Sequence, residues 1–174
     1  MFTIRIHGKS GQECHRVVKI IGRAAFLSGY YVQDSVVYGP EHIESQVDGF
    51  VRIDNKPIVE RGFITNPDFV LVLDDDLDYK NTLKDCKDST LIINTRMAKD
   101  KLKRFVKNVF ALDADTLSKE ISGKYLPSIL LLGAFVKKFN KLSLKLMEKA
   151  IDIETDDRKK ENKEALHEGY KKLK

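Results

Sequence analysis

The sequence predicts an α/β fold built on a mostly parallel β-sheet. Three observations support this: short apolar runs recur along the chain, helix-like segments separate them, and the last third is helical in pattern. A continuous apolar run such as 69–73 is typical of a parallel strand that is covered on both faces. We therefore expect a three-layer, Rossmann-like fold with a local antiparallel hairpin and a helical C-terminal part.

The N-terminal part of the chain follows a strand–loop–helix–strand pattern. A short strand at 2–6 leads through a glycine-rich loop at 7–12 into an amphipathic helix over 13–28. Gly29 stands where a helix C-cap would end that helix. Residues 30–37 are rich in aromatic and β-branched side chains, which indicates a second strand.

The next strands are separated by turns and helices. Residues 47–53 alternate as a strand, and the turn at 54–57 predicts a hairpin with a partner strand at 58–59. Later strands are expected at 69–73, 91–94 and 109–113. Helices are expected at 115–122, 126–139, 143–151 and 157–172. Without repeats or a low-complexity linker, residues 1–174 are expected to form one domain that includes the helices of 126–174.

The composition describes an ordinary globular chain of 174 residues, 42% of them hydrophobic. The longest apolar run, 129–136, is far below the roughly 20 residues that span a bilayer, so no membrane association is expected. The N-terminus enters a strand without the apolar stretch of a signal peptide, which favours a cytoplasmic location. The net charge of +5 arises mostly in 136–174, where acids are interleaved; this favours a solvated helical face over nucleic-acid binding.

Cysteine and histidine spacing argues against a metal centre. Cys14 and Cys86 are far apart, whereas an iron–sulfur cluster needs four thiolates, so both are expected to be reduced, partly buried thiols. The four histidines have no metal-ligand spacing, and no Ser-His-Asp or Cys-His arrangement stands out. We therefore assign neither a metal site nor a catalytic residue to this chain.

The first loop fails the common phosphate-binding patterns. Gly8 fits the first glycine of G-x-G-x-x-G, but Ser10 and Glu13 occupy the other two positions, which disfavours a stand-alone nucleotide-binding module. The same residues match a capping box, in which Ser10 and Glu13 would stabilise the start of the helix by about 1 kcal/mol.

Acidic residues follow two of the later strands. Asp74-Asp75-Asp76 could hold Mg²⁺, but a helix N-cap followed by acids in the first turn is the favoured interpretation. Asp113 is expected to cap the helix that follows it.

A set of ordered fragments resembles one known family. The fragments are 4–12, 24–33, 38–41, 50–54 and 67–74. In that order they are similar to the gamma subunit of pyruvate (2-oxoacid):ferredoxin oxidoreductase, also called pyruvate synthase. The resemblance runs from about residue 2 to 170 and is most specific over 29–74.

The resemblance implies a role inside a larger enzyme. Such complexes oxidatively decarboxylate a 2-oxoacid to an acyl-coenzyme A and pass electrons to ferredoxin. Thiamine diphosphate sits between alpha and beta subunits, and iron–sulfur clusters lie on other chains. The resemblance therefore implies alpha, beta and ferredoxin-like delta subunits as partners, contact with ferredoxin through the complex, no cofactor bound by this chain alone, and no activity alone.

The resemblance also implies which loops would meet coenzyme A or another subunit. The candidate residues are Gly8, Lys9, Ser10, Gly11, Gln12, Tyr38, Gly39, Glu41 and His42. The family loop is close to G-x-G-G-Q-G, and two arginines and a glycine tend to follow the second loop. Ser10 and Glu13 replace two of those glycines, His42-Ile43 replaces the arginines, and Pro127-Ser128 replaces a polar pair.

These departures leave two functional alternatives. Either the chain is an accessory gamma subunit of an active complex, or it is a diverged non-catalytic relative that keeps the fold and an interaction surface. The hypothesis for the first loop is a structural turn with weakened or absent affinity for phosphate, because Glu13 brings a carboxylate to the anion-binding position.

Overall fold

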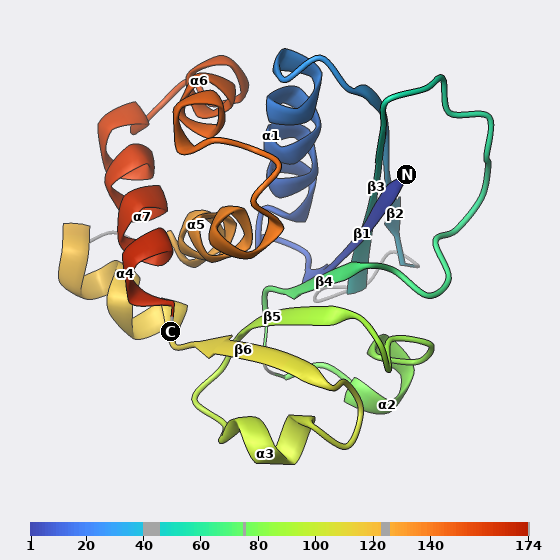
Figure 1. The fold of residues 1–174 in the computed structure, drawn as a ribbon. Helices are drawn as coiled ribbons and strands as arrows, with labels where there is room; N and C mark the ends of the chain where they lie inside the picture. Colours follow the sequence, from blue (N-terminus) through green and yellow to red (C-terminus); the bar gives the residue numbers. More distant parts are fainter. Residues whose placement is uncertain (40–45, 75, 123–125, 174) are drawn as a thin grey trace.

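The computed structural model describes residues 1–39, 46–74, 76–122 and 126–173 (Figure 1). These residues form a six-stranded sheet in the order β2-β3-β1-β4-β5-β6. The strands are β1 (Phe2–Lys9), β2 (Tyr31–Tyr38), β3 (Gln46–Asp54), β4 (Phe69–Val72), β5 (Thr90–Asn94) and β6 (Asn108–Leu112). The predicted α/β class is confirmed.

The sheet has a parallel half and an antiparallel half. β1, β4, β5 and β6 run parallel to one another, whereas β3 lies antiparallel to both β1 and β2. Three of the five neighbouring pairs are therefore parallel, which agrees with the predicted mostly parallel sheet. Ile6 of β1 joins the halves, because it lies opposite Gly49 of β3 on one side and Leu71 of β4 on the other.

The predicted hairpin partner at 58–59 is wrong. Residues 55–68 contain no strand, and β3 pairs instead with β2 and β1 along its whole length. The longer pairing buries Val51 and Ile53 completely, which a two-residue strand beginning after Pro57 could not do. The local antiparallel hairpin of this fold is β2–β3.

The longer helices lie on one side of the sheet (Figure 1). They are α1 (Cys14–Leu27), α4 (Ala114–Ser122), α5 (Pro127–Phe139), α6 (Leu144–Glu154) and α7 (Lys159–Lys172). Of these, α1 and α5 contact the strands of the sheet. α5 is buried along most of its length, as its apolar sequence demands, and α1 packs over the antiparallel half of the sheet. Gly29 follows α1 at φ 87°, and Asp113 Oδ1 accepts the Thr116 amide at 3.1 Å, so both predicted caps are confirmed.

Short segments cover the other face. α2 (Tyr79–Thr82) and α3 (Lys99–Leu102) lie under β4–β6, where a second apolar cluster includes Val72, Ile93 and Leu102. Under the antiparallel half, the Phe63 ring centroid lies 5.5 Å from that of Phe50, and Arg52 donates to the Gly62 carbonyl at 2.9 Å. The fold thus has the three layers that the sequence predicts.

Helices α5 and α7 cross with their backbones in direct contact. A Cβ added at Gly133 would lie 2.0 Å from the Leu166 carbonyl oxygen, and one at Gly169 would lie 1.9 Å from that of Leu130. Residues 132–135 belong to the core, since all four are buried. None of the helices within the described ranges is long and apolar enough to cross a membrane.

Candidate functional site

The glycine-rich loop is organised by Gln12. Its side-chain oxygen accepts the Lys9 amide at 2.7 Å, and its side-chain nitrogen donates to Asp74 Oδ2 at 2.5 Å. The Gln12 amide in turn donates to the Lys9 carbonyl at 3.1 Å, which closes the turn, and Gly11 adopts φ 86° within it. Gln12 therefore ties the end of β1 to the end of β4.

The predicted capping box at 10–13 is wrong. Helix α1 begins at Cys14, and its N-cap is Glu13, in a left-handed conformation with φ 60° and no side-chain cap bond. Ser10 lies too far upstream to cap a helix that begins there. The Glu13 carboxylate instead accepts from Arg16 Nη1 at 2.5 Å and from Ser128 Oγ of α5 at 3.0 Å.

The acidic run after β4 also differs from its predicted role. The N-cap of the next helix is Asp78, whose side chain accepts the Lys80 amide at 3.1 Å, so the capping interpretation of 74–76 is wrong. Asp74 Oδ1 accepts the Asp76 amide at 2.8 Å. Asp75 lies outside the described residues, and among those described no group of three side chains could hold a metal ion.

Lys9 faces these acids across the loop. Its Nζ lies 2.9 Å from Asp76 Oδ2 and 3.8 Å from Asp74 Oδ2. The hydrogen bond and positive charge of Lys9 lower the pKa of Asp76. The positive charges of Lys9 and Arg16, which could have attracted a phosphate, are thus already neutralised by carboxylates of the same chain.

The strand register brings the second candidate loop to the same end of the sheet. Val47 pairs with Gly8 on one side and with Tyr38 on the other, and the Gly39 amide donates to the Gln46 carbonyl at 3.0 Å. The described candidates from both loops, Gly8 to Gln12 with Tyr38 and Gly39, therefore gather at one edge. Glu41 and His42 lie outside the described residues.

A His7–Asp48 pair, in which His7 is buried and Asp48 is partly exposed, was missed by the sequence analysis. His7 Nδ1 lies 2.7 Å from Asp48 Oδ1, which also accepts from Gln46 Nε2 at 2.8 Å. Burial pushes the pKa of Asp48 upward, but the hydrogen bonds from His7 and Gln46 and the nearby charge of Arg5 outweigh it and hold that pKa below its ordinary value. No sequence spacing signals this pair, because only the β1–β3 register places the two residues opposite each other.

The cysteines behave as predicted. Cys14 and Cys86 are free and only 3% and 1% exposed. Burial raises the pKa of Cys14 to about 12 and also raises that of Cys86, so neither is a reactive thiolate.

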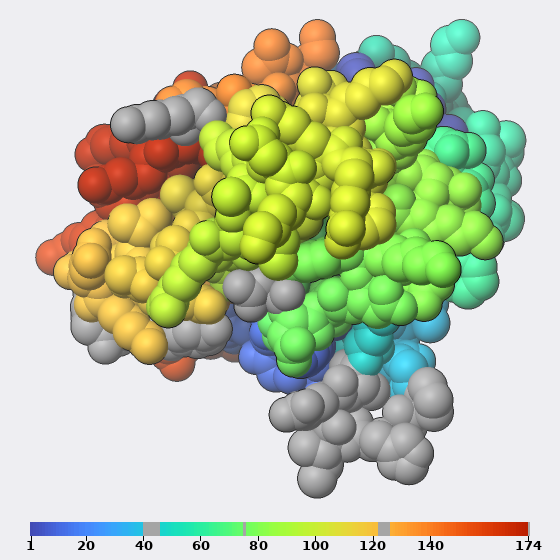
Figure 2. All heavy atoms as spheres, turned by 90° about the horizontal axis from the view of Figure 1, so that it is seen from below, coloured from blue at the N-terminus to red at the C-terminus, as the bar shows by residue number. Residues whose placement is uncertain are grey.

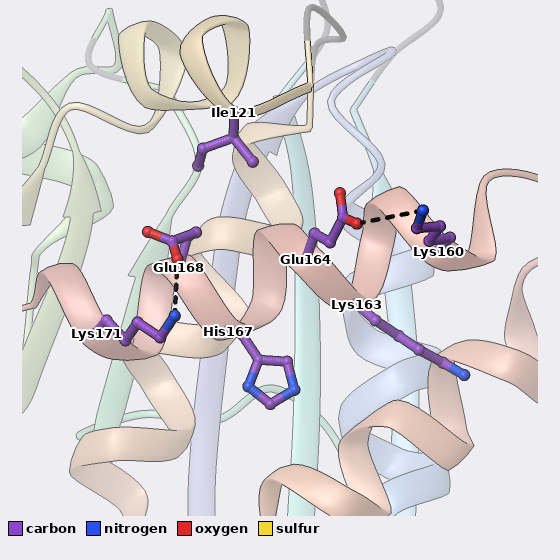
Figure 3. A pocket seen from close by; sticks show the side chains of 7 residues that line it. All are labelled: Ile121, Lys160, Lys163, Glu164, His167, Glu168 and Lys171. Carbon is purple, nitrogen blue, oxygen red and sulfur yellow. Dashed lines mark hydrogen bonds and ion pairs between the residues drawn. The ribbon is translucent and has the colours of Figure 1, made fainter.

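A separate groove of about 490 Å³ lies on α7 beside Ile121 of α4 (Figure 3). Its charged side chains are paired: Lys171 with Glu168 at 3.0 Å, Lys163 with Asp152 at 2.7 Å, and Lys160 with Glu164 at 4.0 Å. These pairs agree with the solvated helical face predicted for the C-terminal part, and they leave no converging charge for a ligand.

A comparison with known protein families identifies the family of this chain. The model of the family described as pyruvate ferredoxin/flavodoxin oxidoreductase matches residues 3–172. The chain belongs to this family. It is 36% identical over 181 residues to the protein of Pyrococcus furiosus named pyruvate/ketoisovalerate oxidoreductases common subunit gamma, with 99% of this chain and 97% of that one covered.

Solved structures agree with the family match. The crystal structure of pyruvate oxidoreductase subunit PORC from Thermotoga maritima superposes with a TM-score of 0.84 at 26% identity, covering 99% of this chain and 97% of that one. A 2-oxoglutarate:ferredoxin oxidoreductase from Magnetococcus marinus shares the fold at 16% identity, with a TM-score of 0.81 over 98% of this chain and 30% of that one. The prediction that this chain is the gamma (PorC) subunit of a pyruvate or 2-oxoacid ferredoxin oxidoreductase complex is confirmed. Other subunits of such a complex are the partners of this chain.

Proposed function

We propose that this chain is the accessory gamma subunit of a complex that oxidatively decarboxylates pyruvate or a related 2-oxoacid to an acyl-coenzyme A. Its partners in that complex are alpha, beta and ferredoxin-like delta subunits, and the electrons leave to ferredoxin. The observation that carries this proposal is the match to a common gamma subunit along almost the whole length of both chains.

The cofactors of the reaction belong to the other subunits in this proposal. A four-iron cluster takes four thiolates, and this chain has two cysteines, both buried and free. The residues therefore do not fit a cluster, and no electron-transfer step is assigned to them. Thiamine diphosphate is likewise assigned to the alpha and beta subunits, and this chain contributes an ordered surface against which the complex assembles.

That surface includes the edge where the two candidate loops meet. Its described members are Gly8, Lys9, Ser10, Gly11, Gln12, Tyr38 and Gly39. We assign the candidates Glu41 and His42, which lie outside the described residues, to the same proposed contact. The pairing of Lys9 with Asp76, and the Glu13 carboxylate at the start of α1, support a structural turn with weakened affinity for phosphate. We therefore assign this edge to contact with another subunit. It contributes little to the affinity of the complex for coenzyme A.

The loop assignment is tested by restoring a glycine at position 13. Glu13→Gly removes the carboxylate and suits φ 60°, so it should tighten coenzyme A binding by about fivefold, the effect of removing one charge from a helix N-terminus. Glu13→Gln is the matched control that removes charge but keeps the side chain. Titration calorimetry on the complex measures its affinity for coenzyme A. The assignment is contradicted if the unaltered complex binds coenzyme A tightly and neither variant changes that affinity.

The whole proposal is tested by recovering the complex. The chain is tagged and purified anaerobically from its own cells, and 2-oxoacid- and coenzyme A-dependent reduction of methyl viologen is measured. Co-purification with larger thiamine-dependent and iron–sulfur subunits and full activity support the gamma subunit. Recovery without such activity favours the second candidate, a diverged non-catalytic relative, to which the internally paired loop charges already point.

A further inference from the structure

Positive charge is concentrated around α3. Residues 96–107 contain six Lys and Arg and one Asp, so this short segment alone carries a charge equal to the net charge of the whole chain. The backbone places Lys87 beside it, because the Lys107 amide donates to the Lys87 carbonyl at 3.1 Å. We name the exposed cations gathered here the α3 face: Lys87, Lys99, Lys101, Lys103, Arg104 and Lys107.

The α3 face lies on the side of the sheet opposite the large helices. Figure 1 shows α3 below β5 and β6, and Figure 2 views the molecule from that side, with the green-to-yellow segment that contains these residues spread across it. The first 135 residues together are nearly neutral, because acidic side chains elsewhere in them balance the positive charge that is concentrated around α3.

Much of this charge is not neutralised within the chain. Lys103 pairs with Asp100 at 2.7 Å, and Lys107 pairs with Asp88. Lys99, Lys101 and Arg104 form no ion pair with any residue that the structure describes; Arg104 lies 4.6 Å from the centroid of the Phe105 ring. The α7 groove differs, since each of its lysines has an acidic neighbour.

The side chains around α3 indicate the class of partner. Every large hydrophobic side chain that is exposed in the described residues lies outside 80–107. Permanent subunit interfaces are depleted of lysine and have apolar centres, and a membrane-binding surface inserts apolar groups, so neither matches this face. The exposed Phe26, Tyr31, Val59 and Phe63, around the opposite end of the sheet, suit permanent contacts better.

We propose that the α3 face steers and docks a small acidic electron-carrier protein, a ferredoxin, onto the complex. Clustered flexible lysines without an apolar centre are suited to brief, salt-sensitive encounters with a carboxylate-rich surface. The proposal rests on the proposed function, which requires a protein that collects electrons. The carrier contacts this chain through charge alone and exchanges electrons with a cluster-bearing neighbour.

The test compares two double charge reversals in the purified complex. Lys99→Glu with Lys101→Glu alters the α3 face, and Lys159→Glu with Lys160→Glu makes the same charge change at exposed positions on α7. At about 0.01 M ionic strength the α3 variant should raise the KM for ferredoxin about tenfold. That difference should shrink at about 0.15 M, where the Debye length is near 8 Å. The α7 variant should leave the KM unchanged.

Methyl viologen separates docking from assembly, because this small dye needs no protein-docking surface. Its reduction rate should be the same in both variants and the parent complex. Loss of this chain from the complex, or an unchanged KM for ferredoxin in the α3 variant, overturns the proposal. Surface plasmon resonance measures the binding of ferredoxin to the same complexes without turnover. It therefore tests docking even if the complexes show no 2-oxoacid activity.

Discussion

Replacing Gly133 with alanine should weaken the packing of α5 on α7. The new Cβ would lie 2.0 Å from the Leu166 carbonyl oxygen and 2.7 Å from the Tyr170 amide nitrogen, both backbone atoms that cannot rotate away. The two helices would have to separate by about 1 Å, and a gap of that size forfeits about a quarter to a half of the dispersion energy at the contact. Overpacking of a core costs about 1–3 kcal/mol, and a backbone clash belongs at the upper end.

The gain in helix propensity opposes this cost. Alanine stabilises a helix interior by about 1 kcal/mol relative to glycine, which leaves a net loss of about 2 kcal/mol in the free energy of unfolding. For a chain of this length, that loss lowers Tm by about 4–8 °C. Urea and thermal denaturation followed by circular dichroism provide the measurement.

Gly22→Ala in α1 is the matched control. Its Cβ would meet the Asp34 carboxylate at 3.0 Å, the far end of a side chain that can move, so this variant should be as stable as the parent or slightly more stable. Equal stability of the Gly133 and Gly22 variants would refute the argument from backbone contact.

Three further predictions concern the loops and the buried groups. Gln12→Ala should lower the free energy of unfolding by about 2 kcal/mol, because the Lys9 amide and Asp74 each lose a hydrogen-bond partner, and thermal denaturation measures the loss. The folded pKa of Asp48 is lowered, so its contribution is present above the unfolded pKa near about 3.9 and is lost as the pH falls through the folded value. Below about pH 4, the free energy of unfolding measured by urea titration should therefore fall less steeply with decreasing pH in Asp48→Asn than in the parent. Both cysteines should resist a thiol reagent in the native state and react in denaturant, and fast native labelling would contradict their burial.

In the candidate loops, the sequence pattern identified some residues of the site but not all of their contacts. Gly8, Gly11 and Gln12 were recognised from their pattern, and the structure shows Gln12 tying the loop to Asp74. The role expected of Glu13 was wrong because a capping box depends on where the helix begins. The box would start the helix at Gly11, whereas α1 begins at Cys14, three residues later. The shift moves the unpaired amides of the helix start away from Ser10, so its side chain has no amide of that first turn to accept from.

The charge distribution shows the same limit on a larger scale. The sequence drew attention to the basic residues after Val136, yet these are interleaved with acids that pair with them on α7. The less obvious cations of 96–107 become one surface only because α3 lies against β5 and β6 beside the turn that contains Lys87.

The sequence by itself determined the α/β class, the apolar character of α5 and the family. Those properties depend on local periodicity and on motifs that survive as ordered fragments. Only the tertiary structure decided that β3 pairs with β1 and β2, that His7 meets Asp48, and that Lys9 is neutralised by Asp76. The two side-chain pairs join residues 41 or more positions apart in the sequence. The pairing of β3 was one of several possible strand pairings, and burial of apolar side chains over the whole core selects it.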